Sequence, residues 1–256
     1  VRKFVVARVS REWKEFHGAN FLKVKNPLTA LQKIAANHRS RFDSPVIGIT
    51  GSNGKTVVKE WLYQLLGHDF NITRSPRSYN SQIGVPLSVW QLDETAELGI
   101  FEAGISQPDE MESLEPIIRP TIGVLTKIGE AHQENFTSLQ QKCLEKLNLF
   151  VNSSVLIFDE DNELVTSCVD RMVLSQKAFS WSRENRDAHL YISRVERKTE
   201  TTRITYSFLN FDYDFELPFT DDASVENAIN CLAVALYLNV APKVIAGRMT
   251  LLEPVA

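Results

Sequence analysis

Short apolar runs alternate with stretches of helical spacing from about residue 28 to residue 158. Each run has the length of a buried strand, and the stretches between repeat apolar side chains every three or four positions. The runs that predict strands lie at 46–50, 70–73, 97–102, 121–127 and 154–158. The stretches that predict helices lie at 28–35, 58–66, 108–118 and 138–151. This alternation predicts an α/β fold with a mostly parallel sheet and helices on both of its faces.

The pattern changes at about residue 176. Residues 189–195, 201–209 and 211–217 are rich in Thr, Ile, Tyr and Phe, and no helical spacing separates them. Strands that follow one another this closely pair antiparallel, so we predict an antiparallel β extension to the main sheet. Two helices, one around 225–236 and one at 242–252, end the chain.

The strand at 46–50 runs into a loop of small residues that opens a helix, Gly51-Ser52-Asn53-Gly54-Lys55-Thr56. A strand, a glycine loop and a helix N-terminus bind phosphates together, because backbone N–H groups and the helix dipole converge on the anion. The lysine of such a loop reaches the outer phosphates, and the hydroxyl after it holds Mg²⁺. Ile49 stands where the commonest phosphate loop has glycine, and the glycines are Gly48 and Gly51 instead. The alternative is an ordinary strand–turn–helix in which Gly-Lys-Thr occurs by chance.

Two further side chains follow strands that we expect to end at the same edge of the sheet. Glu102 ends the strand at 97–102, and His132 follows the strand at 121–127 after the turn at Gly129. Ligands of open α/β sheets bind at this edge. Glu102 there can hold Mg²⁺ against nucleotide phosphates, with an exposed strand-end carboxylate as the alternative. A single histidine in this place is as readily a structural residue as a ligand.

Lys146 interrupts an apolar stripe on the helix at 138–151, where it shares one face with Leu139, Cys143 and Phe150. A lysine in such a stripe extends out to solvent, pairs with an acid, or is chemically altered, for example to a carbamate that could lie beside metal ions. Asn227 falls in the first turn expected for the next long helix. It either caps that helix or binds the edge of a base.

Composition narrows the class of protein. The chain has 256 residues, a net charge of −4 and a pI of about 5.8, with no block of Lys and Arg, which argues against nucleic acid as a partner. No apolar run approaches the roughly 20 residues that span a membrane. The three cysteines are scattered without a CxxC pair, so neither a disulfide framework nor a zinc site is indicated. These features favour a cytoplasmic protein.

Several motifs together resemble the Mur ligase family, and within it the members that add D-alanyl-D-alanine. They run in family order from about residue 45 to the end of the chain. In addition to the phosphate loop they are Asn80-Ser81-Gln82-Ile83-Gly84-Val85-Pro86-Leu87, Phe101-Glu102-Ala103-Gly104, Ile128-Gly129-Glu130-Ala131-His132, Glu145-Lys146 and Val225-Glu226-Asn227-Ala228. The sequence from Ala131 to Phe136 resembles that of members fused to an alanine racemase.

The resemblance implies a domain organisation. Residues 1–44 are similar to the end of the family's N-terminal UDP-binding domain with its linker, and residues 45–256 to the central ATP-binding domain. The family's C-terminal domain would follow and is absent from this sequence. The flanking domains of the same polypeptide are therefore expected partners.

The resemblance also implies an activity. Mur ligases of this type are ATP-dependent amide-bond ligases of peptidoglycan synthesis, and their substrates are UDP-N-acetylmuramoyl-tripeptide and D-Ala-D-Ala. ATP phosphorylates the terminal carboxylate of the tripeptide, and the amine of the dipeptide attacks the acyl phosphate. ATP and Mg²⁺ are thus the expected cofactors.

By the same resemblance, Lys55 stabilises the phosphoryl group in transfer and Asn80 lies near the γ-phosphate. Thr56, Glu102 and His132 hold one Mg²⁺, while a carbamylated Lys146 helps to place a second. Asn227 lies at the adenine.

This sequence departs from the family in two places. The family often carries His-Asn shortly before the adenine-side asparagine, where this chain has Ala223-Ser224. After the strand at 154–158 the family has Asn-Asp residues, and this chain reads Asp159-Glu160-Asp161. Both departures concern base recognition, and neither touches the phosphate chemistry.

Three other functions are compatible with parts of the pattern. The first is another Mur ligase or a folylpolyglutamate synthase, which differs in the amino substrate. The second is a phosphate-loop hydrolase or GTPase, although no NKxD base-reading motif is present and no DxxG follows Glu102. The third is a nucleotide-binding module that is inactive by itself.

Overall fold

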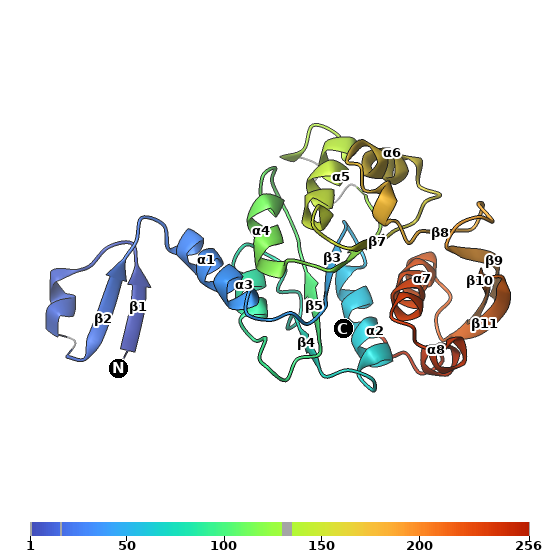
Figure 1. Ribbon diagram of the computed structural model, residues 1–256, viewed down its shortest axis with the longest axis horizontal. Coiled ribbons are helices and arrows are strands. Elements are labelled where there is room, and N and C mark those ends of the chain that lie inside the picture. The colour runs from blue at the N-terminus through green and yellow to red at the C-terminus, as the bar shows by residue number, and fades with distance from the viewer. Residues whose placement is uncertain (1, 16, 130–134, 256) are drawn as a thin grey trace.

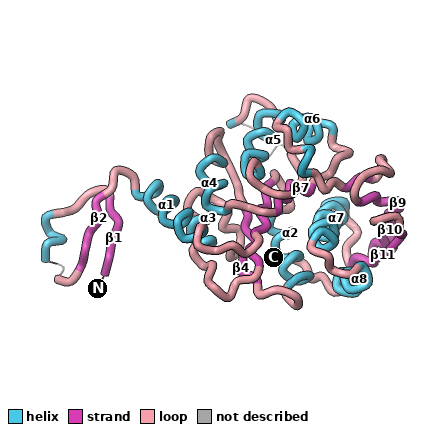
Figure 2. Tube along the Cα trace, in the orientation of Figure 1, coloured by secondary structure: helices cyan, strands magenta, loops and turns pink. Residues whose placement is uncertain are grey.

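A computed structural model describes residues 2–15, 17–129 and 135–255 of the chain. The main body is an α/β domain, and a small pair of N-terminal strands stands away from it (Figure 1). Figure 2 shows how helices surround the strands of the main body.

The central sheet has five parallel strands in the order β4-β5-β3-β6-β7, which confirms the predicted parallel sheet. The strand that precedes the phosphate loop, β3, lies in the middle. Its neighbours are β5 and β6, so the carboxyl ends of these three strands meet at one edge. The bounds are β3 Val46–Thr50, β4 Ile72–Arg74, β5 Leu98–Glu102, β6 Ile122–Leu125 and β7 Val155–Ile157.

Helices cover both faces of the sheet, as predicted. Along β3 the side chains alternate, because successive residues of a strand point to opposite faces. Ile47 and Ile49 belong to the core shared with α2 and α7, while Val46 belongs to the core shared with α3, α4 and α5. On the first side lie α2 Lys55–Leu66, α7 Asp222–Tyr237 and α8 Pro242–Met249. On the second lie α1 Pro27–Arg39, α3 Gly84–Val89, α4 Met111–Ile118, α5 Leu139–Leu147 and α6 Glu163–Arg171, with the 3₁₀ turn η3 Asn148–Phe150 after α5.

The predicted β extension forms a sheet of its own. Strands β9, β10 and β11 pair antiparallel, and β8 joins β9 in parallel. Single bridges, such as the one between Asp159 and Trp181, connect this sheet to the end of β7. The sheet packs on α7 and α8 through the first core. Its bounds are β8 Trp181–Ser182, β9 Leu190–Arg197, β10 Thr202–Phe208 and β11 Phe211–Leu217, and the turn η4 Ser175–Lys177 precedes it.

The expected helix at 108–118 begins later than the sequence indicates, at Met111. The chain before it makes a turn, with Asp109 at a φ of 65°. The Glu110 carboxylate accepts from the backbone N–H groups of Ser106 and Gln107, at 2.6 and 3.0 Å, and so holds that turn outside the helix. Pro108 therefore lies in the turn and not in the first turn of α4.

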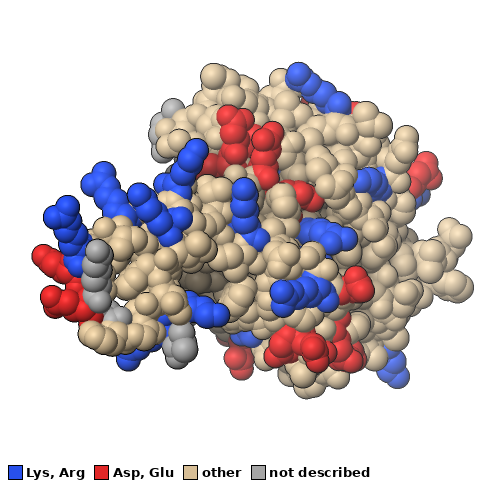
Figure 3. All heavy atoms as spheres, turned by 60° about the vertical axis from the view of Figure 1, so that its left-hand side comes forward, with Lys and Arg blue, Asp and Glu red and all other residues tan. Residues whose placement is uncertain are grey.

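The N-terminal strands β1 Arg2–Val6 and β2 Ala19–Lys23 pair in parallel, with η1 Arg11–Glu15 between them. Figure 3 shows this part of the molecule with Lys and Arg side chains gathered over it, the exposed ones being Arg2, Lys3, Arg8, Arg11, Lys23 and Lys25. By contrast α1 packs on the main body, where Arg39 donates to the carbonyl of Ile118 at 3.0 Å. Within the part of the chain that the structure describes, no helix is both long and apolar enough to span a bilayer.

Candidate functional site

Two glycines shape the loop between β3 and α2. Gly51 has a φ of 152° and Gly54 a φ of 88°, angles that side-chain-bearing residues rarely adopt. A Cβ on Gly51 would lie 2.0 Å from Oγ1 of Thr126, and one on Gly54 would lie 2.3 Å from Oδ1 of Asn227. Glycine therefore lets the loop pack against the end of β6 on one side and against α7 on the other. Gly54 is also the N-cap residue of α2, which begins at Lys55.

Lys55 turns its amine back over the loop. Its Nζ donates to the carbonyl of Gly51 at 2.9 Å and to that of Ser52 at 3.2 Å. The pKa of this amine is lowered, mainly by burial. The charge of Glu102 opposes this shift, and the charge of Lys142 adds to it. The ammonium thus lies over a helix N-terminus, where it can neutralise an anion that approaches the loop.

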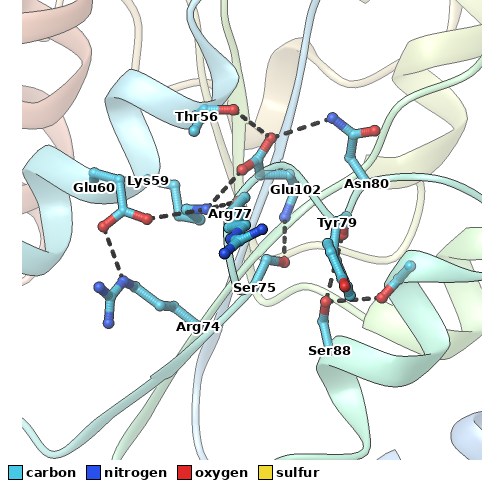
Figure 4. Close-up of polar contacts among 11 residues, drawn as sticks. Thr56, Lys59, Glu60, Arg74, Ser75, Arg77, Tyr79, Asn80, Ser88 and Glu102 are labelled. Atoms are coloured by element: carbon cyan, nitrogen blue, oxygen red, sulfur yellow. Dashed lines mark hydrogen bonds and ion pairs between the residues drawn. The ribbon is translucent and has the colours of Figure 1, made fainter. Parts of the chain in front are cut away.

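Glu102 lies on β5 opposite Ile49 of β3, and its carboxylate is fully buried beside the first turn of α2. One oxygen, Oε2, accepts from Oγ1 of Thr56 at 3.0 Å and from Nδ2 of Asn80 at 3.4 Å (Figure 4). The other, Oε1, lies 2.9 Å from Nζ of Lys59, which is equally buried. The structure therefore brings together three residues that the sequence predicted, and an exposed strand-end carboxylate is excluded.

Lys146 does not extend out to solvent. Its side chain is buried, and its Nζ donates to the carbonyl of Gly51 at 3.0 Å. Lys55 donates to the same carbonyl, so the two amines converge on one atom of the phosphate loop. Burial is the main cause that lowers the pKa of Lys146 to about 7, and the charges of Lys55 and Lys142 lower it further. A hollow of about 410 Å³ opens here, and both amines and Asn80 line it.

Asn227 lies in the second turn of α7, because the helix begins at Asp222. The cap of this helix is Asp221, whose carboxylate accepts from the backbone of Ser224 at 2.8 Å, so Asn227 is not a capping residue. Its side chain packs against Gly54 instead. It lines a second hollow, of about 250 Å³, on the other side of the loop.

Asp159 lines this second hollow, as do Trp181 and Asn230. Burial raises the pKa of Asp159 to about 6; a hydrogen bond from Asp161 opposes the rise, and the charges of Asp161 and Glu226 add to it. Trp181 donates from its indole nitrogen to Oδ1 of Asn230 at 2.9 Å. The hollow thus offers amide and carboxylate groups beside the edge of an indole ring.

His132 lies outside the described residues, so its predicted place near the metal stays a prediction. Within the described ranges, 2–15, 17–129 and 135–255, no group of three His, Cys, Asp or Glu side chains is close enough to hold a metal ion. The oxygen atoms that could hold a hard cation here are those of Thr56 and Glu102.

The sequence reasoning missed two buried lysines. Lys59 is the ion-pair partner of Glu102, and it also donates to the carbonyl of Arg77. Lys142 donates to the carbonyl of Gly129 at 2.5 Å. The N–H of the same glycine donates to Oγ of Ser52 at 2.9 Å. One signal was available for Lys142, since it lies four positions before Lys146 and so shares its helix face. Lys59 lies three positions before Leu62, at the edge of the apolar face of α2, which is a weaker signal.

The model of the Mur ligase middle domain matches residues 49–235 of this chain, which is most of its length. The chain belongs to the Mur ligase family. This membership agrees with the order of motifs in the sequence.

Among curated Mur ligases, the UDP-N-acetylmuramoyl-tripeptide–D-alanyl-D-alanine ligase of Bacillus subtilis is 29% identical over 223 residues, 86% of this chain and 47% of the relative. The enzyme of the same name from Synechocystis is 34% identical over 175 residues, 67% of this chain and 38% of the relative. The chain thus spans about half the length, or less, of the relatives it matches.

Solved Mur ligase structures share the fold. MurF from Acinetobacter baumannii superposes with a TM-score of 0.87 at 21% identity, over 98% of this chain and 54% of that one. MurF from Thermotoga maritima, solved in complex with ADP, superposes with a TM-score of 0.80 at 20% identity, over 98% of this chain and 57% of that one.

Proposed function

We propose that this chain is the ATP-binding core of the ligase that joins D-Ala-D-Ala to UDP-N-acetylmuramoyl-tripeptide in the cytoplasm. The terminal carboxylate of the tripeptide attacks the γ-phosphorus of ATP, and ADP leaves. The amine of D-Ala-D-Ala then attacks the acyl phosphate, loses a proton, and expels inorganic phosphate as the amide bond forms. Residues 1–44 belong to the end of the UDP-binding domain and its linker, and residues 45–256 form the central domain.

One observation supports this proposal most directly: hollows lie on both sides of the same phosphate loop. The hollow at Asn227 has groups that suit a nucleobase, and Asn227 contacts Gly54 of the loop. The hollow at Lys55 and Lys146 contains the Lys55 ammonium, whose charge suits a carboxylate and the phosphoryl group it receives. A nucleotide that crosses the loop would thus present its γ-phosphate to a carboxylate on the far side. Fixed positive charge at that point stabilises the transition state of phosphoryl transfer.

The residues at Glu102 fit Mg²⁺. This ion prefers oxygen ligands and is commonly held by one or two protein groups together with phosphates and water. Oε2 of Glu102 and Oγ1 of Thr56 are 3.0 Å apart, and Thr56 directly follows Lys55. When bound, Mg²⁺ supplies charge neutralisation to the phosphates. His132 completes this ligand set in the proposal.

Lys146 fits the proposed carbamate. A lysine reacts with CO₂ only as the neutral amine, and burial with two neighbouring lysines favours that form. Because the pKa of the amine is about 7, its neutral fraction grows as the pH rises through 7. We therefore expect a carbamate signal in NMR spectra recorded with isotopically labelled bicarbonate, stronger at pH 8 than at pH 6 and absent in Lys146→Met. A signal that persists in the variant would remove Lys146 from this role.

The experiment that tests the function is a ligation assay of the full-length gene product. Each amino acceptor of the family, D-Ala-D-Ala, meso-diaminopimelate, L-Lys and Glu, is offered with ATP, Mg²⁺ and its own UDP-muramoyl substrate. We expect amide product with D-Ala-D-Ala alone. Product with another acceptor would point to a sister ligase, and ADP release without any amide would point to a hydrolase.

A further inference from the structure

The ammonium of Lys59 lies among three oxygen atoms, one turn of α2 after the phosphate loop. Its Nζ is 2.9 Å from Oε1 of Glu102 and 3.1 Å from Oε1 of Glu60, and it donates to the carbonyl of Arg77. Figure 4 shows this amine between the two carboxylates. The Lys59 side chain is fully buried, and an ammonium has three N–H donors. Its donors and the surrounding oxygens match in number, so the amine is fixed in place.

This contact makes the two oxygens of the Glu102 carboxylate different. Oε1 is buried and accepts no hydrogen bond from the residues that the structure describes, so its polar partner among them is the charge of Lys59. Oε2 accepts from Oγ1 of Thr56 and lies on the side of the phosphate loop. A cation bound at the loop can therefore use Oε2, whereas at Oε1 it would be repelled by the Lys59 ammonium.

The number of oxygens that a carboxylate offers distinguishes between divalent cations. Ca²⁺ takes about six to eight oxygen ligands in a flexible arrangement, and carboxylates often bind it through both oxygens. Mg²⁺ is smaller, requires near-octahedral geometry at short distances, and is usually held by one or two carboxylates together with phosphates and water. A carboxylate with one available oxygen therefore suits Mg²⁺ and lacks the second oxygen that Ca²⁺ can use.

We propose that Lys59 is a positioning residue that limits Glu102 to one metal-binding oxygen and thereby gives the nucleotide site its preference for Mg²⁺ over Ca²⁺. The proposal deepens the proposed function and rests on it. Lys59 acts through the carboxylate and not by contact with the cation. Residues that contact a metal ligand in this way typically change metal affinity by about tenfold to a hundredfold.

The test is calorimetric titration of the full-length gene product with a non-hydrolysable ATP analogue, in saturating Mg²⁺, in saturating Ca²⁺ and in EDTA. The measured quantity is the ratio of the Kd in Ca²⁺ to the Kd in Mg²⁺. We expect the original protein to bind more tightly in Mg²⁺. In Lys59→Met we expect the ratio to fall by about tenfold, because Oε1 is then available to Ca²⁺. Both Kd values come from one preparation, so a loss of stability in the variant does not change their ratio.

Three further variants separate charge from packing. Lys59→Arg keeps a cation beside Oε1, so we expect it to keep the ratio. Lys59→Gln removes the same charge as Lys59→Met, with the same expected fall, and replaces it if Lys59→Met does not fold. Arg39→Met is the matched control, because Arg39 is also buried but donates to the carbonyl of Ile118, before the start of β6 and so at the opposite end of the sheet from Glu102. We expect no change of the ratio in this control.

Equal Kd values in Mg²⁺ and Ca²⁺ for the original protein, or an unchanged ratio in the variants without the charge, would show the inference to be wrong. An equal fall in Lys59→Met and Lys59→Arg would assign the preference to packing and would also overturn it. If the original protein did not bind the analogue, or bound it equally well in EDTA, the proposed nucleotide and Mg²⁺ site would fail instead.

Discussion

Glu102 shows at the scale of one residue how the site combines stability with function. Its carboxylate is fully buried, and an ionised carboxylate in such a place requires a partner of opposite charge. Lys59 supplies that charge at Oε1, which leaves Oε2 to Thr56 and Asn80 on the side of the phosphate loop. The ion pair thus stabilises a charged carboxylate inside the core, the one that we propose as a ligand of Mg²⁺.

We predict that Lys59→Met lowers the free energy of unfolding by about 3–5 kcal/mol, because it leaves the Glu102 charge buried without its partner. Lys127→Met is the control, since Lys127 is 3.2 Å from Glu226 but 55% exposed, and loss of such a surface pair costs about 0–1 kcal/mol. Urea unfolding of the two variants measures both values. The double variant Lys59→Met/Glu102→Gln should regain part of the loss. Equal, small losses in both single variants would show that the buried pair contributes no more than a surface pair.

The sequence predicted best those elements in which the positions of the apolar residues match the buried positions. Strands β3, β5, β6 and β7 are buried, and their continuous apolar runs gave their place and their parallel pairing. The elements that escaped prediction have weak patterns. Helix α3 is short and contains Gly84 and Pro86, and β2 includes Ala19 and Asn20. Tertiary packing fixes these elements, and a local pattern carries little of that information.

The site divides in the same way. Lys55, Thr56 and Glu102 could be placed because each lies at or shortly after the end of a strand in the middle of the sheet. Lys59 could not, because it lies at the edge of the apolar face of α2, seven positions before Leu66, where a lysine can be buried or can extend to solvent. Its burial depends on the loop after β4, which crosses over it at Arg77. A contact that joins residues so far apart in sequence has no local signature.

At the scale of elements, Gly54 joins the start of α2 to α7. We predict that Gly54→Ala destabilises the protein by more than roughly 1–2 kcal/mol, which is the cost of placing an alanine in the left-handed conformation. The loss is larger because the added Cβ would also displace Asn227. Gly247→Ala is the matched control: Gly247 lies within α8, and its added Cβ meets nothing within 4 Å. That change should stabilise the protein by about 0.5–1 kcal/mol. Thermal unfolding measures both, and a stabilising Gly54→Ala would contradict the geometry of the loop.

At the scale of the whole molecule, three openings meet at the N-terminus of α2. Gly51 and Lys55 line the hollow at Lys146, and Thr56 lines a groove of about 640 Å³ along α2. The hollow at Asn227 adjoins the loop because Asn227 contacts Gly54. This arrangement follows from the position of β3 in the middle of the sheet, because neighbouring strands then end on both sides of the loop. Three reactants can therefore reach the loop from separate directions, which the proposed ligation with ATP, a carboxylate and an amine requires.

The residues that we expect to contact the nucleotide, from Gly51 after β3 to Asn227 on α7, lie within this chain. We therefore predict that the chain as it stands binds a non-hydrolysable ATP analogue with Mg²⁺, and that it ligates poorly or not at all, since it spans about half the length of its curated relatives. Calorimetric titration measures the binding. Lys55→Met should weaken the binding by about tenfold to a hundredfold, the effect of losing a charged hydrogen bond. Lys198→Met is the control and should leave the binding unchanged, because Lys198 lies in the turn between β9 and β10 and pairs with Glu216. Absence of heat from the original chain would refute the binding, and efficient amide formation by it would refute the need for further domains.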